Sequence, residues 1–575
     1  MKANYDRYPY VRISPHTHDC ETGWDTILRR IEPLVKNKSS VVCIECYPGV
    51  FDEDIRRAVN EHFPSAVVTD AASFQKAPTL IEALVARDLT NDPVFGVLTH
   101  LELRDFFHET PLNDRTQGLH FVIGVGASVL CPTPDLLIYV NLARWEIQQR
   151  QRRNEIGNFA GENLRASAAE KYKRAFFIDW RAADRLKKRL LPCIDFLIDA
   201  NDRLQPKMLS GEAYRAALAH TVRRPFRVVP FFDPGPWGGQ WMRDTYGLPP
   251  GPSNYAWCFD CVPEENSLVL GFGDLRVEVP AIDLVFLHPR ELLGEAVHAR
   301  FGAEFPIRFD LLDTMQGGNL SLQVHPLTEY IQERFGMHYT QDESYYMLDA
   351  GDDACVYLGL REDVDSNAMI RELRDGQISG APFDAEKHVN LWPARKHDHF
   401  LIPAGTVHCS GKNSMVLEIS ATPYIFTFKL WDWGRLGMDG RPRPIHLEDG
   451  VSNIQWDRTT TWVKRELINQ FEPVAEGDGW REERTGLHKR EFIETRRHWF
   501  TQPVPHQTNG GVNVLNLVGG DEVIVESPKQ AFDPVVIHYS ESFIVPAAVD
   551  SYLITPKTSD CEPYATIKAF VRTNA

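Results

Sequence analysis

Residues 319–360 read NLSLQVHPLTEYIQERFGMHYTQDESYYMLDAGDDACVYLGL, and residues 402–420 read IPAGTVHCSGKNSMVLEIS. In the first segment Gln323 and His325 are two apart, so on an extended strand their side chains point to the same face. Glu343 begins ESYYMLDA, whose aromatic and apolar residues favour a strand. His408 follows the Pro/Gly turn of PAGT, which aims the next strand inward. The two segments predict a barrel of antiparallel strands with polar side chains inside it.

The polar side chains form a set that suits a divalent transition metal: Gln323, His325, Glu343 and His408. Two imidazoles, one carboxylate and one carboxamide leave coordination positions free for water or substrate. Such an open site is typical of catalysis, whereas a closed structural site lacks free positions.

These motifs resemble those of the class I mannose-6-phosphate isomerases, which are zinc-dependent cupin enzymes. QVHP, the Glu before a Tyr-rich strand and PAGTVH carry the resemblance, together with WGG at 237–239, FPIRFDLLDT at 305–314 and WDWGRLGMDGRPRPIHLEDG at 431–450. By motif order it covers roughly residues 224–575. The resemblance implies one Zn²⁺ per chain, or another divalent transition metal, and interconversion of mannose 6-phosphate and fructose 6-phosphate through an enediol-like intermediate.

The resemblance also implies roles for residues around the metal. It implies that Lys429, Glu418 and Arg435 are catalytic. It also implies that Ser321, Arg435 and Trp237 bind the substrate. Structural interpretations of the polar residues stay open: a strand hydroxyl at Ser321, a structural carboxylate at Glu418, and surface charges at Lys429 and Arg435. On an extended strand over 425–431, Lys429 lies on a mostly apolar face, which favours a pocket.

Several substrate-side positions depart from the family. Lys429 stands where the family has Arg, and Gln341 stands where it has Lys. On the strand before QVHP, Asp310 falls nearest the family's Lys, with Arg308 two residues before it on the same strand face. These departures leave two alternatives: an isomerase or epimerase of another sugar or sugar phosphate, and a non-catalytic metal cupin that senses sugars.

The first 200 or so residues alternate strand-like and helix-like runs, beginning with SSVVCIECY and DEDIRRAVNEHF. This alternation predicts a parallel sheet covered by helices and resembles P-loop kinases. The turn at 45–54, ECYPGVFDED, has one glycine, no phosphate-binding lysine and three carboxylates near the expected phosphate position. We expect a degenerate kinase-like domain that does not bind ATP.

The predicted fold class is therefore multidomain, with an α/β domain followed by mainly-β cupin (jelly-roll) domains. The kinase-like domain covers 1–222 and closes with a helical segment at 171–218, which Pro192 would kink or divide. A metal-binding cupin covers 223–458. A second cupin-like domain without metal covers 459–575, since VPAAVDSY echoes the PAGT turn.

The overall composition argues against some classes of binding partner. A net charge of −17 argues against a nucleic-acid surface, which needs clustered Lys and Arg. No apolar stretch reaches the length of a membrane span, and the N-terminus has no apolar core like that of a secretory signal. Ten cysteines in 575 residues are too sparse for a disulfide framework. We expect a cytoplasmic enzyme that binds a small sugar phosphate and no membrane; the oligomeric state stays open.

Overall fold

The computed structural model describes residues 4–14, 19–35, 40–108, 118–423, 425–489, 491–558 and 563–573. The chain forms two compact units. The α/β unit comprises Tyr10–Thr221 and Pro263–His288. The β unit comprises Met1–Pro9, Val222–Val262 and Pro289–Ala575.

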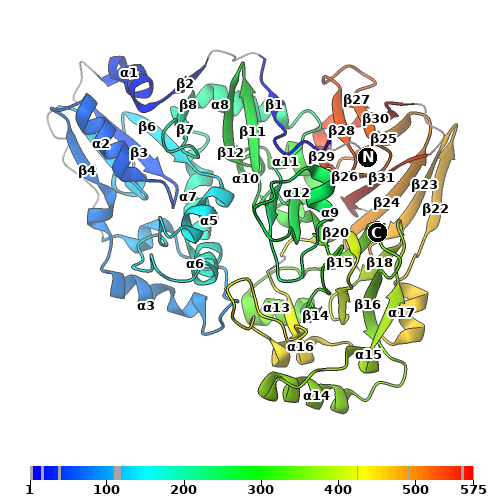
Figure 1. The fold of residues 1–575 in the computed structure, drawn as a ribbon. Coiled ribbons are helices and arrows are strands. Elements are labelled where there is room, and N and C mark those ends of the chain that lie inside the picture. Colours follow the sequence, from blue (N-terminus) through cyan, green and yellow to red (C-terminus); the bar gives the residue numbers. More distant parts are fainter. Residues whose placement is uncertain are drawn as a thin grey trace. The chain divides into compact units, whose positions relative to one another are not determined.

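A seven-stranded sheet forms the core of the α/β unit (Figure 1). Its strands are β2 (Cys20–Thr22), β3 (Val41–Cys46), β4 (Val67–Asp70), β5 (His120–Gly124), β6 (Leu136–Asn141), β7 (Phe196–Asp199) and β8 (Lys207–Ser210). Their order is β2-β8-β7-β6-β3-β5-β4. From β4 to β7 neighbouring strands are parallel, and β8 and β2 add antiparallel pairs. β3 and β6 are apolar runs that are buried almost throughout, as expected for parallel strands covered by helices.

Helices and short turns connect these strands. They are α1 (Trp24–Val35), α2 (Asp52–His62), η1 (Ala71–Phe74), α3 (Pro78–Leu89), η2 (Leu103–Phe106), α4 (Ala127–Leu130), α5 (Arg144–Arg152), α6 (Ala168–Arg174), η3 (Ala175–Asp179), α7 (Trp180–Leu190), α8 (Gly211–Thr221) and α10 (Ile282–Leu287). α7 ends two residues before Pro192. The predicted helical segment at 171–218 is wrong only in the stretch that follows, because FLID forms β7 and KMLS forms β8, and the chain is helical again in α8. A short, fully buried apolar run fits a strand as well as a helix, so periodicity alone could not separate them.

Pro263–His288 lies within the domain predicted at 223–458, yet it packs with the α/β unit. It supplies β11 (Ser267–Phe272) and β12 (Leu275–Pro280), which form a small sheet with β1 (Val11–Arg12), and it supplies α10. On α10, Asp283 forms a fully buried ion pair with Lys187 of α7 and accepts a hydrogen bond of 2.8 Å from Tyr214. A buried carboxylate without such partners would be strongly destabilising, so these contacts explain why the segment belongs here.

The loop between β3 and α2 occupies the predicted P-loop position. Its Gly49 carbonyl accepts a hydrogen bond of 3.0 Å from Arg150. The carboxylates of Asp52 and Asp54 are paired with Arg56 at 3.1 Å and Arg203 at 2.5 Å. The hollow beside the loop has a volume of about 10 Å³, which is room for about one water molecule. The kinase-like assignment and the absence of ATP binding stay predictions.

Two antiparallel sheets build the first part of the β unit. The six-stranded sheet, in the order β18-β15-β20-β13-β10-β9, contains β9 (Phe231–Asp233), β10 (Trp257–Cys261), β13 (Ile307–Asp313), β15 (Glu343–Ala350), β18 (His399–Ile402) and β20 (Ser414–Ala421). The five-stranded sheet, in the order β17-β16-β19-β14-β21, contains β14 (Leu322–Val324), β16 (Cys355–Leu360), β17 (Val389–Pro393), β19 (His408–Ser410) and β21 (Phe428–Trp431). Glu343 of the first sheet contacts His408 of the second, so the sheets face each other across a polar interior.

Two further antiparallel sheets follow in the C-terminal part. One, in the order β22-β23-β24-β31-β26-β29, contains β22 (Glu472–Gly477), β23 (Trp480–Gly486), β24 (Ile493–Phe500), β26 (Asn513–Gly519), β29 (Ser542–Val545) and β31 (Tyr564–Val571). The other, in the order β25-β30-β27-β28, contains β25 (Val504–Gln507), β27 (Glu522–Glu526), β28 (Val535–His538) and β30 (Ser551–Pro556). Apolar residues of both sheets share one core. The predicted multidomain, largely β organisation is confirmed, whereas the finer kinase-like and cupin assignments stay predictions.

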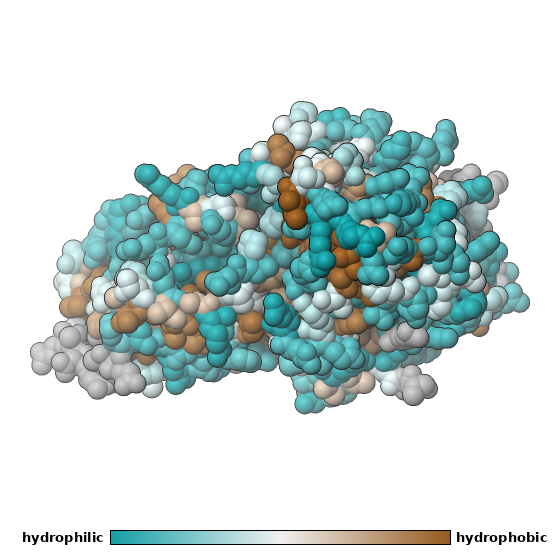
Figure 2. Space-filling model, turned by 90° about the horizontal axis from the view of Figure 1, so that it is seen from below, coloured by the Kyte–Doolittle hydropathy of each residue, from teal (hydrophilic) through white to brown (hydrophobic). Residues whose placement is uncertain are grey.

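Helices in the β unit lie between strands, and most of them are short. They are α9 (Trp241–Tyr246), α11 (Pro289–Leu293), α12 (Glu295–Phe301), α13 (Thr328–Phe335), α14 (Ser366–Ser379), α15 (Ala385–His388), α16 (Leu447–Asn453), α17 (Thr460–Glu466) and η4 (Ala547–Val549). Among the described residues, no helix is both long and apolar enough to span a membrane. Figure 2 shows a face of mostly hydrophilic surface with smaller hydrophobic areas between.

Candidate metal centre and its surroundings

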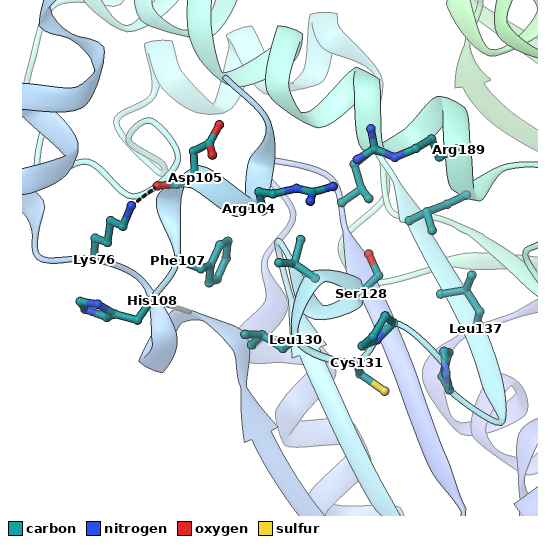
Figure 3. A pocket seen from close by; sticks show the side chains of 15 residues that line it. Lys76, Arg104, Asp105, Phe107, His108, Ser128, Leu130, Cys131, Leu137 and Arg189 are labelled. Atoms are coloured by element: carbon teal, nitrogen blue, oxygen red, sulfur yellow. Dashed lines mark hydrogen bonds between the residues drawn. The ribbon is translucent and has the colours of Figure 1, made fainter. Parts of the chain in front are cut away.

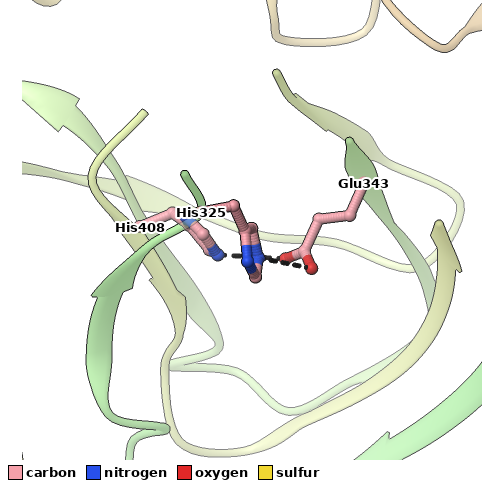
Figure 4. A group of neighbouring side chains, drawn as sticks. All are labelled: His325, Glu343 and His408. Carbon is pink, nitrogen blue, oxygen red and sulfur yellow. Dashed lines mark hydrogen bonds and ion pairs between the residues drawn. The ribbon is translucent and has the colours of Figure 1, made fainter. Parts of the chain in front are cut away.

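The strand register brings the predicted metal ligands together. Gln323 of β14 pairs directly with His408 of β19, which places both side chains on one face. The His325 Nε2 atom lies 2.9 Å from Glu343 Oε2, and His408 Nε2 lies 3.0 Å from Glu343 Oε1 (Figure 4). Gln323 Nε2 lies 3.3 Å from His408 Nε2. One ligand atom from each histidine and from Glu343 lies within 4.8 Å of the others, and all three residues are buried.

Hydrogen bonds at Nδ1 of the two histidines determine whether Nε2 of each ring can bind a metal. His408 Nδ1 lies 2.8 Å from the Thr406 carbonyl, and His325 Nδ1 lies 3.4 Å from the Phe426 carbonyl. A carbonyl only accepts, so each Nδ1 carries a proton, and each Nε2, which faces the Glu343 carboxylate, is the nitrogen that can bind a metal once it is deprotonated. A proton or a metal ion between each Nε2 and the carboxylate makes these contacts favourable. Outer hydrogen bonds of this kind are those that orient metal-ligating imidazoles, so the donor set fits a divalent metal.

The Glu343 carboxylate and the neighbouring imidazoles shift one another's pKa. Burial works against the charged form of Glu343, but the two imidazoles outweigh it and hold the pKa of Glu343 well below its usual range. Burial lowers the pKa of His325, yet the Glu343 carboxylate reverses this and raises it. Gln341 donates hydrogen bonds of 3.2 Å to both Glu343 and Glu418, and thus links the metal ligand to the next carboxylate.

Glu418, predicted to be catalytic, lies on β20 and is held by neighbouring donors. Its Oε1 accepts hydrogen bonds from Arg308 at 2.7 Å and Ser420 at 3.1 Å. Burial first and the charge of Glu343 second raise the pKa of Glu418, while Arg308 opposes them. Arg308 also pairs with Asp310, so this guanidinium supplies a cation near the position where the family has a lysine. The site therefore holds a proton-accepting group whose basicity depends on Arg308.

Lys429 lies on β21 directly opposite Gln323, so its side chain projects to the same face as a predicted metal ligand. The regular strand covers only Phe428–Trp431, which is shorter than the extended segment expected at 425–431. Burial lowers the pKa of Lys429 to about 8, with Arg443 and Arg435 adding to the shift and Asp432 opposing it. A half-buried amine of this kind exchanges protons near neutral pH.

A polar network borders Lys429. Asp432 accepts hydrogen bonds from Arg435 at 2.9 Å, from Arg443 at 2.6 Å and from the Ser321 hydroxyl at 3.0 Å. Arg443 also donates to the Ser321 Oγ at 2.7 Å. Two guanidinium groups around one carboxylate leave a net positive charge beside Ser321. Ser321 and Arg435 thus meet at Asp432, while their roles in substrate binding stay predictions.

Arg443 was missed by sequence reasoning, although it lies in the quoted segment 431–450. The sequence feature that could have indicated it is the basic motif RPRP at 441–444, shortly after Asp432. Trp237 has a different place: its side chain is 2% exposed and packs edge-on against Trp257 with ring centroids 4.7 Å apart. Its carbonyl accepts a hydrogen bond of 3.0 Å from Gly318, so Trp237 supports the loop before Ser321.

Comparisons with known proteins divide along the chain. A family model described as a domain of unknown function (DUF8485) matches residues 23–223. The mannose-6-phosphate isomerase ManA of Bacillus subtilis (strain 168) is 27% identical over 238 residues, covering 40% of this chain and 68% of that protein. The chain resembles mannose-6-phosphate isomerases over part of its length. A mannose-6-phosphate isomerase of Streptococcus mutans serotype c is 27% identical over 217 residues, covering 37% of this chain and 63% of that protein.

Among solved structures, the mannose 6-phosphate isomerase from Bacillus subtilis is similar with a TM-score of 0.49 and 18% identity, covering 60% of this chain and 99% of that chain. The sequence relatives support a sugar-phosphate isomerase, and the His325/Glu343/His408 cluster supports a metal site. The identity of the metal, the sugar substrate and the roles of individual residues remain predictions.

Proposed function

We propose that the chain is a metal-dependent aldose–ketose isomerase that interconverts mannose 6-phosphate and fructose 6-phosphate. The observation that carries the proposal is the convergence of two imidazoles and a carboxylate beside an amine of lowered pKa and an arginine pair. The partial similarity to mannose-6-phosphate isomerases supports the same reaction class.

The metal would be held by Gln323, His325, Glu343 and His408, with Zn²⁺ as the proposed ion. A bound divalent ion polarises the carbonyl and hydroxyl oxygens of the sugar and lowers the cost of an enediolate. Gln341 orients the Glu343 carboxylate by its hydrogen bond of 3.2 Å. The buried position of the ligands excludes bulk water from the reacting carbons.

Arg435, Arg443 and Ser321 would bind the phosphate. Each guanidinium can turn part of its fork from Asp432 to phosphate oxygens, and the Ser321 hydroxyl can donate once it is released from Asp432. The sugar phosphate would therefore compete with Asp432 for the same donors, which makes Asp432 a positioning residue for the two arginines.

Lys429 and Glu418 are the candidates for proton transfer. Isomerisation removes the proton from C2 of the aldose, delivers a proton to C1, and shifts a hydroxyl proton between the two oxygens. A neutral Lys429 amine could accept the carbon-bound proton, since its pKa of about 8 leaves part of it unprotonated near pH 7. Glu418 is the alternative base, but its Oε1 is occupied by Arg308 and Ser420.

A specific observation favours a second candidate substrate. Where the resembled family has lysines, the described chain has Gln341 at the metal ligand and an Arg308–Asp310 pair on β13. These groups recognise hydroxyls differently from an ammonium, so another sugar or sugar phosphate could be the substrate of the same reaction type.

A coupled assay with mannose 6-phosphate, glucose 6-phosphate and free mannose, with and without a chelator, tests the proposal. We expect chelator-sensitive turnover of mannose 6-phosphate that returns on adding Zn²⁺. Faster turnover of another sugar would reassign the substrate. Tight sugar-phosphate binding without turnover would refute the isomerase and favour the sensing alternative.

A further inference from the structure

The α/β unit contains a cavity that the proposed isomerase reaction does not use. Its volume is about 660 Å³, within the range of roughly 300–1,000 Å³ that small-molecule sites occupy. The cavity is lined by residues of η2, α4, β6 and α7 and by the segments that follow η1 and α4 (Figure 3). The family model that matches this region assigns it no function.

The floor of the cavity is apolar. Leu130 and Phe107 are almost fully buried in it, and Leu137, Leu186 and Leu190 continue the same surface. The wall depends on Gly126, whose φ is +85° and where an added Cβ would lie 2.3 Å from the Phe107 ring. The GVGAS turn therefore fits only with glycine at this position, where the Phe107 ring packs directly against it.

The rim of the cavity is basic. Lys76, Arg104 and Arg189 all line it, and Asp105 is the one carboxylate among the lining residues. The Asp105 carboxylate accepts a hydrogen bond of 2.8 Å from the main-chain nitrogen of Glu102, so it is engaged in the turn at η2. Lys76 donates a hydrogen bond of 2.7 Å to the main-chain carbonyl of Asp105 (Figure 3).

Both arginines already share a counter-ion. Glu102 lies 2.9 Å from Arg104 and 3.3 Å from Arg189. Arg104 and Arg189 are exposed and Glu102 is half-buried, and solvent-screened ion pairs of this type are weak, so an incoming anion can compete with Glu102. Three cations against Glu102 and Asp105 still leave a net positive rim on a chain whose net charge is −17.

We infer that this cavity binds a small organic anion, whose apolar body rests on the floor while its phosphate or carboxylate head is held by Arg104, Arg189 and Lys76. An apolar body alone would make no contact with the net positive charge of the rim. An inorganic anion alone would leave the apolar floor exposed to water, which is unfavourable. The combination of rim and floor therefore selects an amphipathic anion.

Calorimetry on the full chain tests the site with four probes: octyl phosphate, octanoate, inorganic phosphate and octyl glucoside. We expect octyl phosphate or octanoate to bind at least tenfold more tightly than inorganic phosphate and octyl glucoside, and the better of the two identifies the head group. Affinity should fall as salt rises, because the rim is exposed. Equal affinity for octyl phosphate, inorganic phosphate and octyl glucoside would overturn the inference.

Variants separate this site from nonspecific binding. Both arginines are exposed, so the R104Q/R189Q variant should fold, as circular dichroism can verify. Its affinity for the better-binding probe should be lower by tenfold or more. Leu190→Glu adds a carboxylate at a half-buried position of the cavity lining, so it should lower the affinity for this probe as well. The matched control is Arg29→Gln, an exposed arginine of the same unit that pairs with Asp25. Unchanged affinity in R104Q/R189Q, or equal loss in the control, would refute the site.

Discussion

Replacing Lys429 with Met tests whether this amine transfers protons or stabilises the enediolate. With a pKa of about 8, roughly one amine in ten is neutral at pH 7, compared with about one in 3,000 at the ordinary pKa of 10.5. Loss of one acid–base group usually costs about two to four orders of magnitude in turnover. We expect Lys429→Met to reduce kcat to that extent while metal content stays unchanged.

The pH dependence gives the direction of the proton transfer. If the neutral amine is the base, kcat/KM rises with pH and levels off above about 8, because deprotonation creates the active form. If the ammonium stabilises the enediolate, activity falls above about 8 instead. In either case the limb near pH 8 should disappear in the Met variant. Lys429→Arg keeps a positive charge but cannot act as a base near neutrality, so it should retain activity only in the second case.

A matched control separates charge from position. Lys412 is an exposed lysine between β19 and β20 that pairs with Asp353 at 2.7 Å, and Lys412→Met should leave both turnover and the pH profile unchanged. The steady-state assay with mannose 6-phosphate and a metal analysis of each variant complete the measurement. Near wild-type turnover in Lys429→Met, or an unchanged limb near pH 8, would refute the assignment and leave Glu418 as the working base.

Further outcomes follow from the same structure. His325→Ala and His408→Ala should each lose the metal, because each removes one of only two nitrogen donors, whereas the exposed His338→Ala should keep it; stoichiometric metal in the ligand variants would contradict the site. Arg443→Gln should raise the KM for the sugar phosphate by roughly 10- to 100-fold, since a hydrogen bond to a charged group is worth about 1.5–3 kcal/mol, with little effect on free mannose; equal loss for both sugars would argue against a phosphate contact. ATP should show no binding by calorimetry, because the loop between β3 and α2 carries carboxylates and has neither the lysine nor the glycine-rich run that holds phosphates, and micromolar affinity at this loop would disprove this reasoning.

Part of the site could be predicted from the sequence because it depends on local geometry. Gln323 and His325 share a face through the two-residue period of a strand, and PAGT before His408 is a turn whatever surrounds it. The resemblance to a known family, through the order of its motifs along the chain, implied roles for Ser321, Glu418, Lys429 and Arg435. Local rules failed where one pattern fits two structures: FLID, buried on all sides, became β7 rather than a helix.

Only the tertiary structure decided which distant groups meet. Glu343 reaches the two histidines because two sheets face each other, and Arg443 reaches Ser321 because the chain after β21 turns back across 122 residues of sequence separation. The register that sets Lys429 opposite Gln323 depends on strand pairing between segments about 100 residues apart. Likewise the buried Lys187–Asp283 pair draws Pro263–His288 into the α/β unit. Residue spacing determines which face of a strand a side chain occupies, but packing between elements determines what that face meets, and that information is not local.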